Sequence, residues 1–344
     1  MRIHRCQPES ALLVASLLMG WTLAQEPAPN QPESSQPSAE TLPTEQAQRI
    51  VGEPGSDEEW DVWLLIEQAS NLEEQATLAR RFLENYPDSG LTPYAHRIIA
   101  TYLYQQGEFE AFIPHAEAVV EEVPDAVDSL SELAFLYAEQ KKPELAIDRA
   151  ERALDQLDNV QKPLEAPARS WVSEMYRVRA ESHYALGRAR LSQFSEAPET
   201  ERKELLEEAV EQLESALRYR PDHDFASFRL GFAERNQGDV RGTLMAYGRA
   251  AVLGGVASEP SKAAVEEILG IIQRSSPDSE WAQRSLDDVL SMAAQELERE
   301  QTRLQNQISQ VVQQIEAQER AFMQQPAPQD GPATWESVDP GPGR

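Results

Sequence analysis

The sequence predicts an all-α protein: an α-solenoid of helix–turn–helix repeats followed by one long C-terminal helix. Three observations support this prediction. Ala, Leu, Glu, Gln and Arg are abundant, and few β-branched residues alternate with period two, which favours helices over strands. Pairs of short amphipathic patterns recur between residues 57 and 255. From residue 280 to 324 the chain contains neither Pro nor Gly.

The clearest helix pair runs from Asp224 to Gly255. Its first helix carries Leu230 and Gly231 among several phenylalanines, and its second carries Leu244 and Tyr247 at helical spacing. Gly238 lies between them, where a glycine can take the left-handed conformation that ends a helix. Small residues stand where the two helices approach each other. The pattern therefore predicts two packed helices joined by a tight turn.

This unit resembles one tetratricopeptide repeat, a helix pair of about 34 residues. Numbered from Asp224, the matching residues are Leu230, Gly231, Gly238, Tyr247 and Ala250, at repeat positions 7, 8, 15, 24 and 27. Two residues depart from the pattern. Glu234 holds position 11, where the family usually has an aromatic residue, and Thr243 holds position 20, where it usually has Ala.

Further copies of the pattern precede this one. Ser56 and Asn71, each followed three residues later by Glu, open two helices, and the second ends in FLENYPDS, which is similar to helix-pair ends in bacterial envelope proteins of this family. The segment 93–124 is a divergent copy, and 127–159 matches the family best. A long helix from about Ser170 to Gln193 precedes a loop at 195–200, so the next copy carries an insertion. A capping helix follows over 262–273, which places a solenoid of about five pairs at 57–274.

The long helix of 278–324 carries a heptad pattern. Leucine or valine recurs every seven residues at 290, 297, 304 and 311, and Ala294, Ile308, Ile315 and Phe322 occupy the matching positions. The pattern favours a coiled coil, with self-association of the chain through residues 286–322. The competing interpretation is a single helix that folds back on the solenoid. Gln301 and Gln318 interrupt the apolar seam under either interpretation.

The two ends of the chain predict segments outside the solenoid. Residues 1–24 have the features of a secretory signal peptide: Arg2 and Arg5, an apolar run from Ala11 to Met19, and small residues before the end. We therefore expect export to the periplasm or cell envelope, with no transmembrane span after cleavage. Residues 25–56 and 325–344 are rich in Pro and polar residues, which predicts disorder.

Composition and motifs exclude several classes of function. A formal net charge of −28 opposes nucleic-acid binding, which needs a Lys/Arg surface. The sequence has no HExxH, GxSxG, GxGxxG or GxxxxGK[ST] motif, and its one cysteine, Cys6, lies in the signal segment. We therefore expect no catalytic residues, no cofactor and no metal site, and a protein that is not an enzyme.

The resemblance implies that the protein binds a protein or peptide partner in a concave groove, lined mainly by the first helix of each pair. The family positions fall on Tyr94, Arg97, Tyr104, Phe135, Arg177, Tyr184, Phe225, Phe228, Phe232 and Arg235, and also on Thr101, Asp128 and Ser131. The three last phenylalanines form an apolar stripe that suits a peptide or helix, unless they pack in the core instead. We expect a scaffold or adaptor of the bacterial cell envelope. The alternatives are an oligomeric structural protein acting through its long helix, or an accessory subunit of an envelope enzyme or export system.

Overall fold

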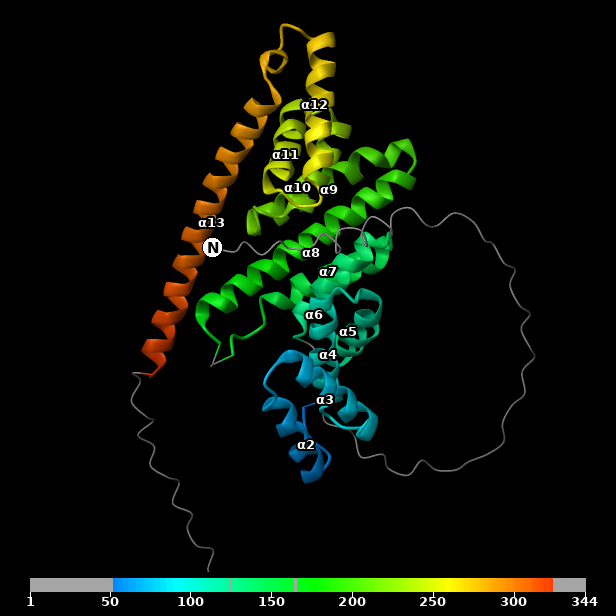
Figure 1. Cartoon of the computed structure of the whole chain (residues 1–344), viewed down its shortest axis with the longest axis vertical. Helices are drawn as coiled ribbons and strands as arrows, with labels where there is room; N and C mark the ends of the chain where they lie inside the picture. The colour runs from blue at the N-terminus through cyan, green and yellow to red at the C-terminus, as the bar shows by residue number, and fades with distance from the viewer. Residues whose placement is uncertain (1–51, 124, 164–165, 324–344) are drawn as a thin grey trace, which may run out of the picture.

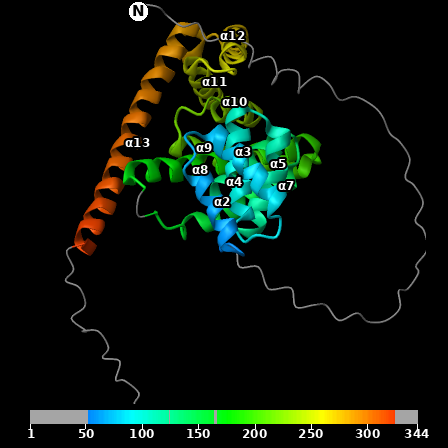
Figure 2. The ribbon, with the colours of Figure 1, turned by 60° about the horizontal axis from the view of Figure 1, so that its bottom comes forward.

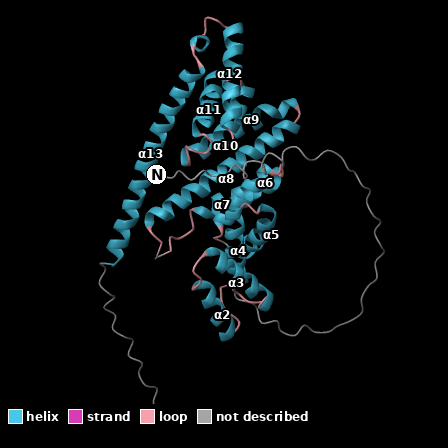
Figure 3. Cartoon of the chain, in the orientation of Figure 1, coloured by secondary structure: helices cyan, strands magenta, loops and turns pink. Residues whose placement is uncertain are grey.

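The computed structural model describes residues 52–123, 125–163 and 166–323, and within these ranges the chain folds into helices without strands (Figure 3). The signal peptide, most of the linker and the C-terminal tail predicted above lie outside the described residues. Ten of the described helices form five pairs. They are α2 (Asp57–Glu67) and α3 (Leu72–Asn85), α4 (Thr92–Gln106) and α5 (Phe109–Glu122), α6 (Val127–Glu139) and α7 (Pro143–Leu157), α8 (Ala168–Glu196) and α9 (Glu199–Tyr219), and α10 (Asp224–Gln237) and α11 (Val240–Leu253).

The pairs stack into an elongated array that begins at α2 and ends at α12 (Ser258–Ser275) (Figure 1). The helices within each pair pack together, and each pair packs on its neighbours, so the apolar core continues from pair to pair. This is the all-α solenoid that the sequence predicts. Its helix starts are also as predicted, because Ser56 Oγ and Asn71 Oδ1 accept hydrogen bonds from the backbone N–H groups of Glu59 and Glu74.

Two glycines let helices approach closely at the same point of two pairs. A Cβ added to Gly231 would lie 2.8 Å from the Tyr247 ring, and one added to Gly187 would lie 2.7 Å from Leu213 Cγ. No larger residue fits at either place without displacing the facing helix. The turn at Gly238 has φ 83°, the left-handed conformation expected there. The local packing of the resembling family is thus present in α8–α9 and in α10–α11.

The insertion predicted in the α8–α9 pair is helical rather than a long loop. Leu213 follows Gly187 by 26 residues, whereas Tyr247 follows Gly231 by 16. The ten additional residues lengthen both helices, because α8 continues to Glu196 and α9 begins at Glu199. The predicted loop at 195–200 is therefore reduced to a short turn at the tip of a protruding hairpin (Figure 1).

The long C-terminal helix folds back along the solenoid. After the 3-10 turn η1 (Glu280–Gln283), α13 (Leu286–Met323) runs from the α12 end towards the start of α8 (Figures 1 and 2). Near its start, Ala293 packs on Gly248 of α11, where an added Cβ would lie 3.0 Å from Ala293 Cβ. Farther along, Val312 is buried with Val172 of α8.

The apolar heptad positions of α13 therefore serve contacts within the chain. Ile308, Val311 and Ile315 pack on the first turns of α8, and Lys162 Nζ lies 2.9 Å from Glu319 Oε1. Within the single chain, the described residues adopt the competing arrangement, a helix that folds back, and the coiled coil stays a prediction. Self-association through residues 286–322 stays a prediction.

Candidate functional site

A chain of ion pairs joins the first helices of successive pairs. It links α4 to α6, α6 to α8, and α8 to the turn before α10. We call these residues the ionic strip, and its pairs are Arg97–Asp128 at 2.8 Å, Arg177–Glu132 at 3.4 Å and Arg220–Glu181 at 2.5 Å. Arg177 also contacts Glu174 at 2.6 Å. Three of the predicted groove residues, Arg97, Asp128 and Arg177, thus belong to one continuous polar surface.

Burial changes the acid–base properties of the strip. Burial raises the pKa of Glu132 to about 8, even though Arg177 acts to lower it. Burial also acts to raise the pKa of Glu181, but His223, Arg220 and Arg177 together hold that pKa below its ordinary value. Glu132 thus holds its proton more tightly than an exposed glutamate does, whereas Glu181 releases its proton more readily. Groups perturbed by burial next to specific charges mark candidate functional sites.

The strip contains buried acceptors without donors. Within the described residues, Asp128 Oδ1 and Glu181 Oε2 are buried and accept no hydrogen bond, although His223 Nε2, itself without a hydrogen-bond partner, lies 3.4 Å from Glu181 Oε2. An unsatisfied buried acceptor costs about 1–3 kcal/mol relative to a satisfied one. Because neither oxygen is exposed to solvent, a partner could donate an N–H group to it only after the neighbouring side chains move. The arrangement thus suits a partner that brings hydrogen-bond donors or basic side chains.

The predicted aromatic residues of the first helices lie beside or below this strip. Tyr104 packs on Phe109 and Phe112, and burial followed by the charge of Glu132 raises its pKa. The Phe135 ring packs against the Tyr184 ring in a tilted arrangement, with centroids 5.5 Å apart. Tyr184 is fully buried and its hydroxyl donates to Glu139, so it is a core residue that cannot meet a partner directly.

The three phenylalanines predicted as an apolar stripe are separated by the packing. Phe225 contacts the core cluster of α8 and α9, whereas Phe228 contacts the cluster of α11, α12 and α13. Phe232 alone is exposed, at 39%. Phe225 and Phe228 are thus only partly buried, against different clusters, and their role in binding a partner stays a prediction. The remaining predicted residues are peripheral: Tyr94 is half-buried beside Gly52, and Arg235 pairs with Glu267 of α12 at 2.9 Å.

Sequence reasoning missed most of the carboxylates of the strip, although a signal was present. In α6, charged or aromatic residues stand at 128, 132, 135 and 139, and in α8 they stand at 177, 181, 184 and 188. The spacing of 4, 3 and 4 is the same in both helices, and each set follows one helix face. The structure joins them: Arg188 Nε lies 3.5 Å and Arg229 Nη2 lies 3.6 Å from the Glu139 carboxylate.

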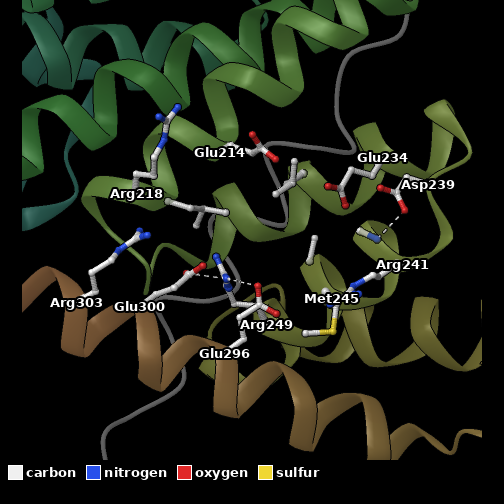
Figure 4. Close-up of a pocket in the computed structure, with 14 residues that line it drawn as sticks. Glu214, Arg218, Glu234, Asp239, Arg241, Met245, Arg249, Glu296, Glu300 and Arg303 are labelled. Carbon is white, nitrogen blue, oxygen red and sulfur yellow. Dashed lines mark hydrogen bonds and ion pairs between the residues drawn. The ribbon is translucent and has the colours of Figure 1, made fainter.

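A second candidate site is the cleft beneath α13, with a volume of about 400 Å³. Residues of α9, α10, α11 and α13 line it, and Figure 4 shows their charged side chains around the opening. Arg249 of α11 crosses to α13, where its Nη2 lies 2.7 Å from Glu300 Oε2. Glu234, the residue that departs from the family pattern, is 8% exposed and lines the same cleft.

Two further features are absent from the described residues. No cluster of three or more His, Cys, Asp or Glu side chains there is arranged to hold a metal ion. Likewise, none of the described helices combines the length and apolar character needed to span a bilayer.

Neither a protein-family profile nor a curated protein sequence matches this chain. Solved structures to which it is similar include yeast Tom70, at 14% identity with a TM-score of 0.42, over 63% of this chain and 40% of Tom70. Another is a human IFIT1 dimer with PPP-AAAA, at 14% identity with a TM-score of 0.31, over 76% of this chain and 64% of that one. The chain thus spans less than two thirds of the length of either protein. Its fold assignment rests on the helix pairs themselves.

Proposed function

We propose that this protein is a non-enzymatic scaffold that binds a protein segment along the ionic strip. The observation that carries this proposal is the set of buried charges with unmet acceptors at Asp128 and Glu181. A solenoid does not need buried charges for its fold, because its helix pairs are already held by apolar contacts. Donors supplied by a partner would satisfy these oxygens.

The charge of the chain indicates the kind of partner. With a formal net charge of −28, long-range attraction favours a partner whose binding surface is basic. A Lys or Arg side chain beside Asp128 and Glu132 would also favour the ionised form of Glu132. Binding is therefore expected to weaken as salt concentration rises.

The proposal includes a location in the bacterial cell envelope. It is supported by the signal-peptide features of residues 1–24 and by the FLENYPDS string. Expression of the full chain in a Gram-negative host, followed by fractionation and N-terminal sequencing, tests this part. Cleavage after Ala24 with periplasmic recovery is expected, and an intact N-terminus in the cytosol would contradict it.

Binding is tested with residues 25–344 immobilised and exposed to a cell-envelope extract. The double substitution D128N/E132Q replaces the two carboxyl groups by amides of nearly the same shape, while E207Q does the same to an exposed carboxylate of α9 as the control. Proteins retained by the wild type and by E207Q, but reduced at least tenfold by D128N/E132Q, support the proposal. Equal retention by all three forms refutes binding along the strip. Circular dichroism melting confirms that each variant is folded.

A further inference from the structure

Glu234 in the cleft beneath α13 is a buried carboxylate that the proposed scaffold function does not use. It stands in α10 at a position where the resembling family usually has an aromatic residue. Its carboxylate lies over Gly242, and a Cβ at residue 242 would collide with it. Its Oε2 is buried and has no hydrogen-bond partner within the described residues. The residue as a whole is only 8% exposed, and it lines the cleft. The helix pair thus makes room for a carboxylate that nothing within the described residues satisfies.

The opposite end of the cleft carries arginines without carboxylate partners. Among the described residues, Arg218 of α9 donates only to Ser215 Oγ, at 2.6 Å, and Arg303 of α13 pairs with no carboxylate. Both line the adjoining pocket as well, together with Gln307 and Gln310. Figure 4 shows the two arginines on the side of the cleft away from Glu234 and Asp239. The cleft therefore has the unpartnered Glu234 carboxylate at one end, near Arg241 and Arg249, and two arginines at the other, near Glu300.

We propose that this cleft binds a short unblocked peptide, with its ammonium group at Glu234 and its carboxylate between Arg218 and Arg303. An ammonium group supplies the N–H donors that Glu234 lacks. Arginine side chains recognise carboxylates through paired N–H groups, and two of them face this end. A volume of about 400 Å³ falls within the usual range of small-molecule sites.

The charges around Glu234 agree with a cationic group there. Facing it are Glu214 of α9, Asp239 before α11, Arg241 and Arg249 of α11, and Glu296 of α13. Arg249 is engaged by Glu300. Burial, followed by Asp239 and Glu214, raises the pKa of Glu234 to about 8. An ammonium group in their midst would offset the repulsion among these acids.

The peptide would also connect α13 to the solenoid. Arg303 belongs to α13, whereas Glu234 and Arg218 belong to α10 and α9. A peptide that contacts all three residues stabilises the docked position of the helix. Binding should therefore raise the melting temperature of the whole chain, because ligands that bind only the native state stabilise it.

The test uses residues 25–344 with di-, tri- and tetra-alanine as probes, because peptide length sets the distance between the two charged ends. Calorimetry and thermal melting are compared for each free peptide and for its N-acetylated and C-amidated forms. We expect one free peptide to bind and raise the melting temperature, and either blocked form to bind at least tenfold more weakly. No binding by any free peptide at millimolar concentration, or equal binding of blocked peptides, overturns the proposal.

Substitutions at both ends of the cleft complete the test. E234Q keeps the side-chain shape, and R303A removes one arginine, so each should weaken peptide binding at least tenfold. The matched controls are E204Q on the exposed face of α9 and R299A on the exposed face of α13, neither of which lines the cleft. The controls should bind like the wild type. Unchanged binding by E234Q, in a protein that melts cooperatively, overturns the assignment.

Discussion

The α8–α9 and α10–α11 pairs share one packing point and differ in what surrounds it. In each, a glycine of the first helix lies under a large residue of the second, Gly187 under Leu213 and Gly231 under Tyr247. In α8–α9, the residue three positions after the glycine is Arg190, and the residue five positions before the large one is Glu208. These two form an ion pair at 2.7 Å. The corresponding residues of α10–α11 are Glu234 and Gly242. Here the Glu234 carboxylate lies over the glycine, and its buried Oε2 has no hydrogen-bond partner within the described residues.

This difference separates what the fold needs from what it permits. The contact at the glycine recurs because the two helices must meet there at short distance. The neighbouring position tolerates a satisfied charge pair in one helix pair and an unsatisfied carboxylate in the other. The Arg190–Glu208 pair needs no ligand. The Glu234 carboxylate lacks a hydrogen bond, and a ligand that donates one would gain the free energy of that bond. Of the two helix pairs, α10–α11 is therefore the one in which a ligand would supply a missing interaction.

The largest expected effect is at the shared packing point of the longer pair. Leu213→Ala should lower the free energy of unfolding by about 3 kcal/mol, because Leu213 is fully buried and Gly187 cannot fill the space left. Urea unfolding followed by circular dichroism measures the loss. Leu145→Ala, at a site 42% exposed, is the control and should cost less than about 1 kcal/mol. Similar losses in both variants would mean that the contact is not a structural requirement.

The same contact in the shorter pair is expected to reject a methyl group. Gly231→Ala should destabilise the protein by about 2 kcal/mol, because the new Cβ would press on the Tyr247 ring. Gly270→Ala in α12 is the matched control. Its Cβ would meet only the end of the Arg274 side chain, so the higher helix propensity of Ala should stabilise the protein by about 0.5–1 kcal/mol. A neutral or stabilising Gly231→Ala would disprove the close approach.

The unsatisfied carboxylate is expected to make stability depend on pH. Because the pKa of Glu234 is about 8 in the native state and about 4.5 when exposed, the native state holds an extra proton between these values. Stability should therefore fall as pH rises from 5 to 8. E234Q should remove this part of the fall and be more stable than the wild type by about 1 kcal/mol at pH 8.

Urea unfolding of both proteins at pH 5 and pH 8 measures this effect. Glu132 has a pKa raised in the same direction, to about 8, and remains in both proteins, so the difference between the two curves isolates Glu234. Parallel stability curves for wild type and E234Q would show that the carboxylate at position 234 finds a partner in solution.

The smallest effect on stability is expected at the Arg190–Glu208 ion pair. A double-mutant cycle of Arg190→Ala and Glu208→Ala should give a coupling free energy of about 0.5 kcal/mol, because both side chains are partly exposed. Raising the salt concentration to 1 M should reduce this coupling. A coupling of several kcal/mol would contradict the comparison, because the pair would then be as important to the fold as the glycine contact.

Much of the local structure could be predicted from the sequence. The caps at Ser56 and Asn71, the left-handed turn at Gly238 and the small residue at Gly231 are written in short segments, and the structure confirms them. The site was predicted less well. Arg97, Asp128 and Arg177 were found by position in the repeat, but Glu132, the partner of Arg177, and the Arg220–Glu181 pair were not. Projection onto repeat positions finds a helix face, and it does not say which charges on that face are buried.

The sequence by itself determined the helix pairs, their turns and the unbroken C-terminal helix, because helix periodicity and capping depend on neighbours within a few residues. Only the tertiary structure decided three further features: that α13 packs on α11 and α8, that Phe225 and Phe228 enter different clusters, and that Glu234 is buried in a cleft. Each of these depends on which apolar stripes meet across large sequence separations. An amphipathic helix shows that it has a buried face, and only the packed chain shows what covers that face.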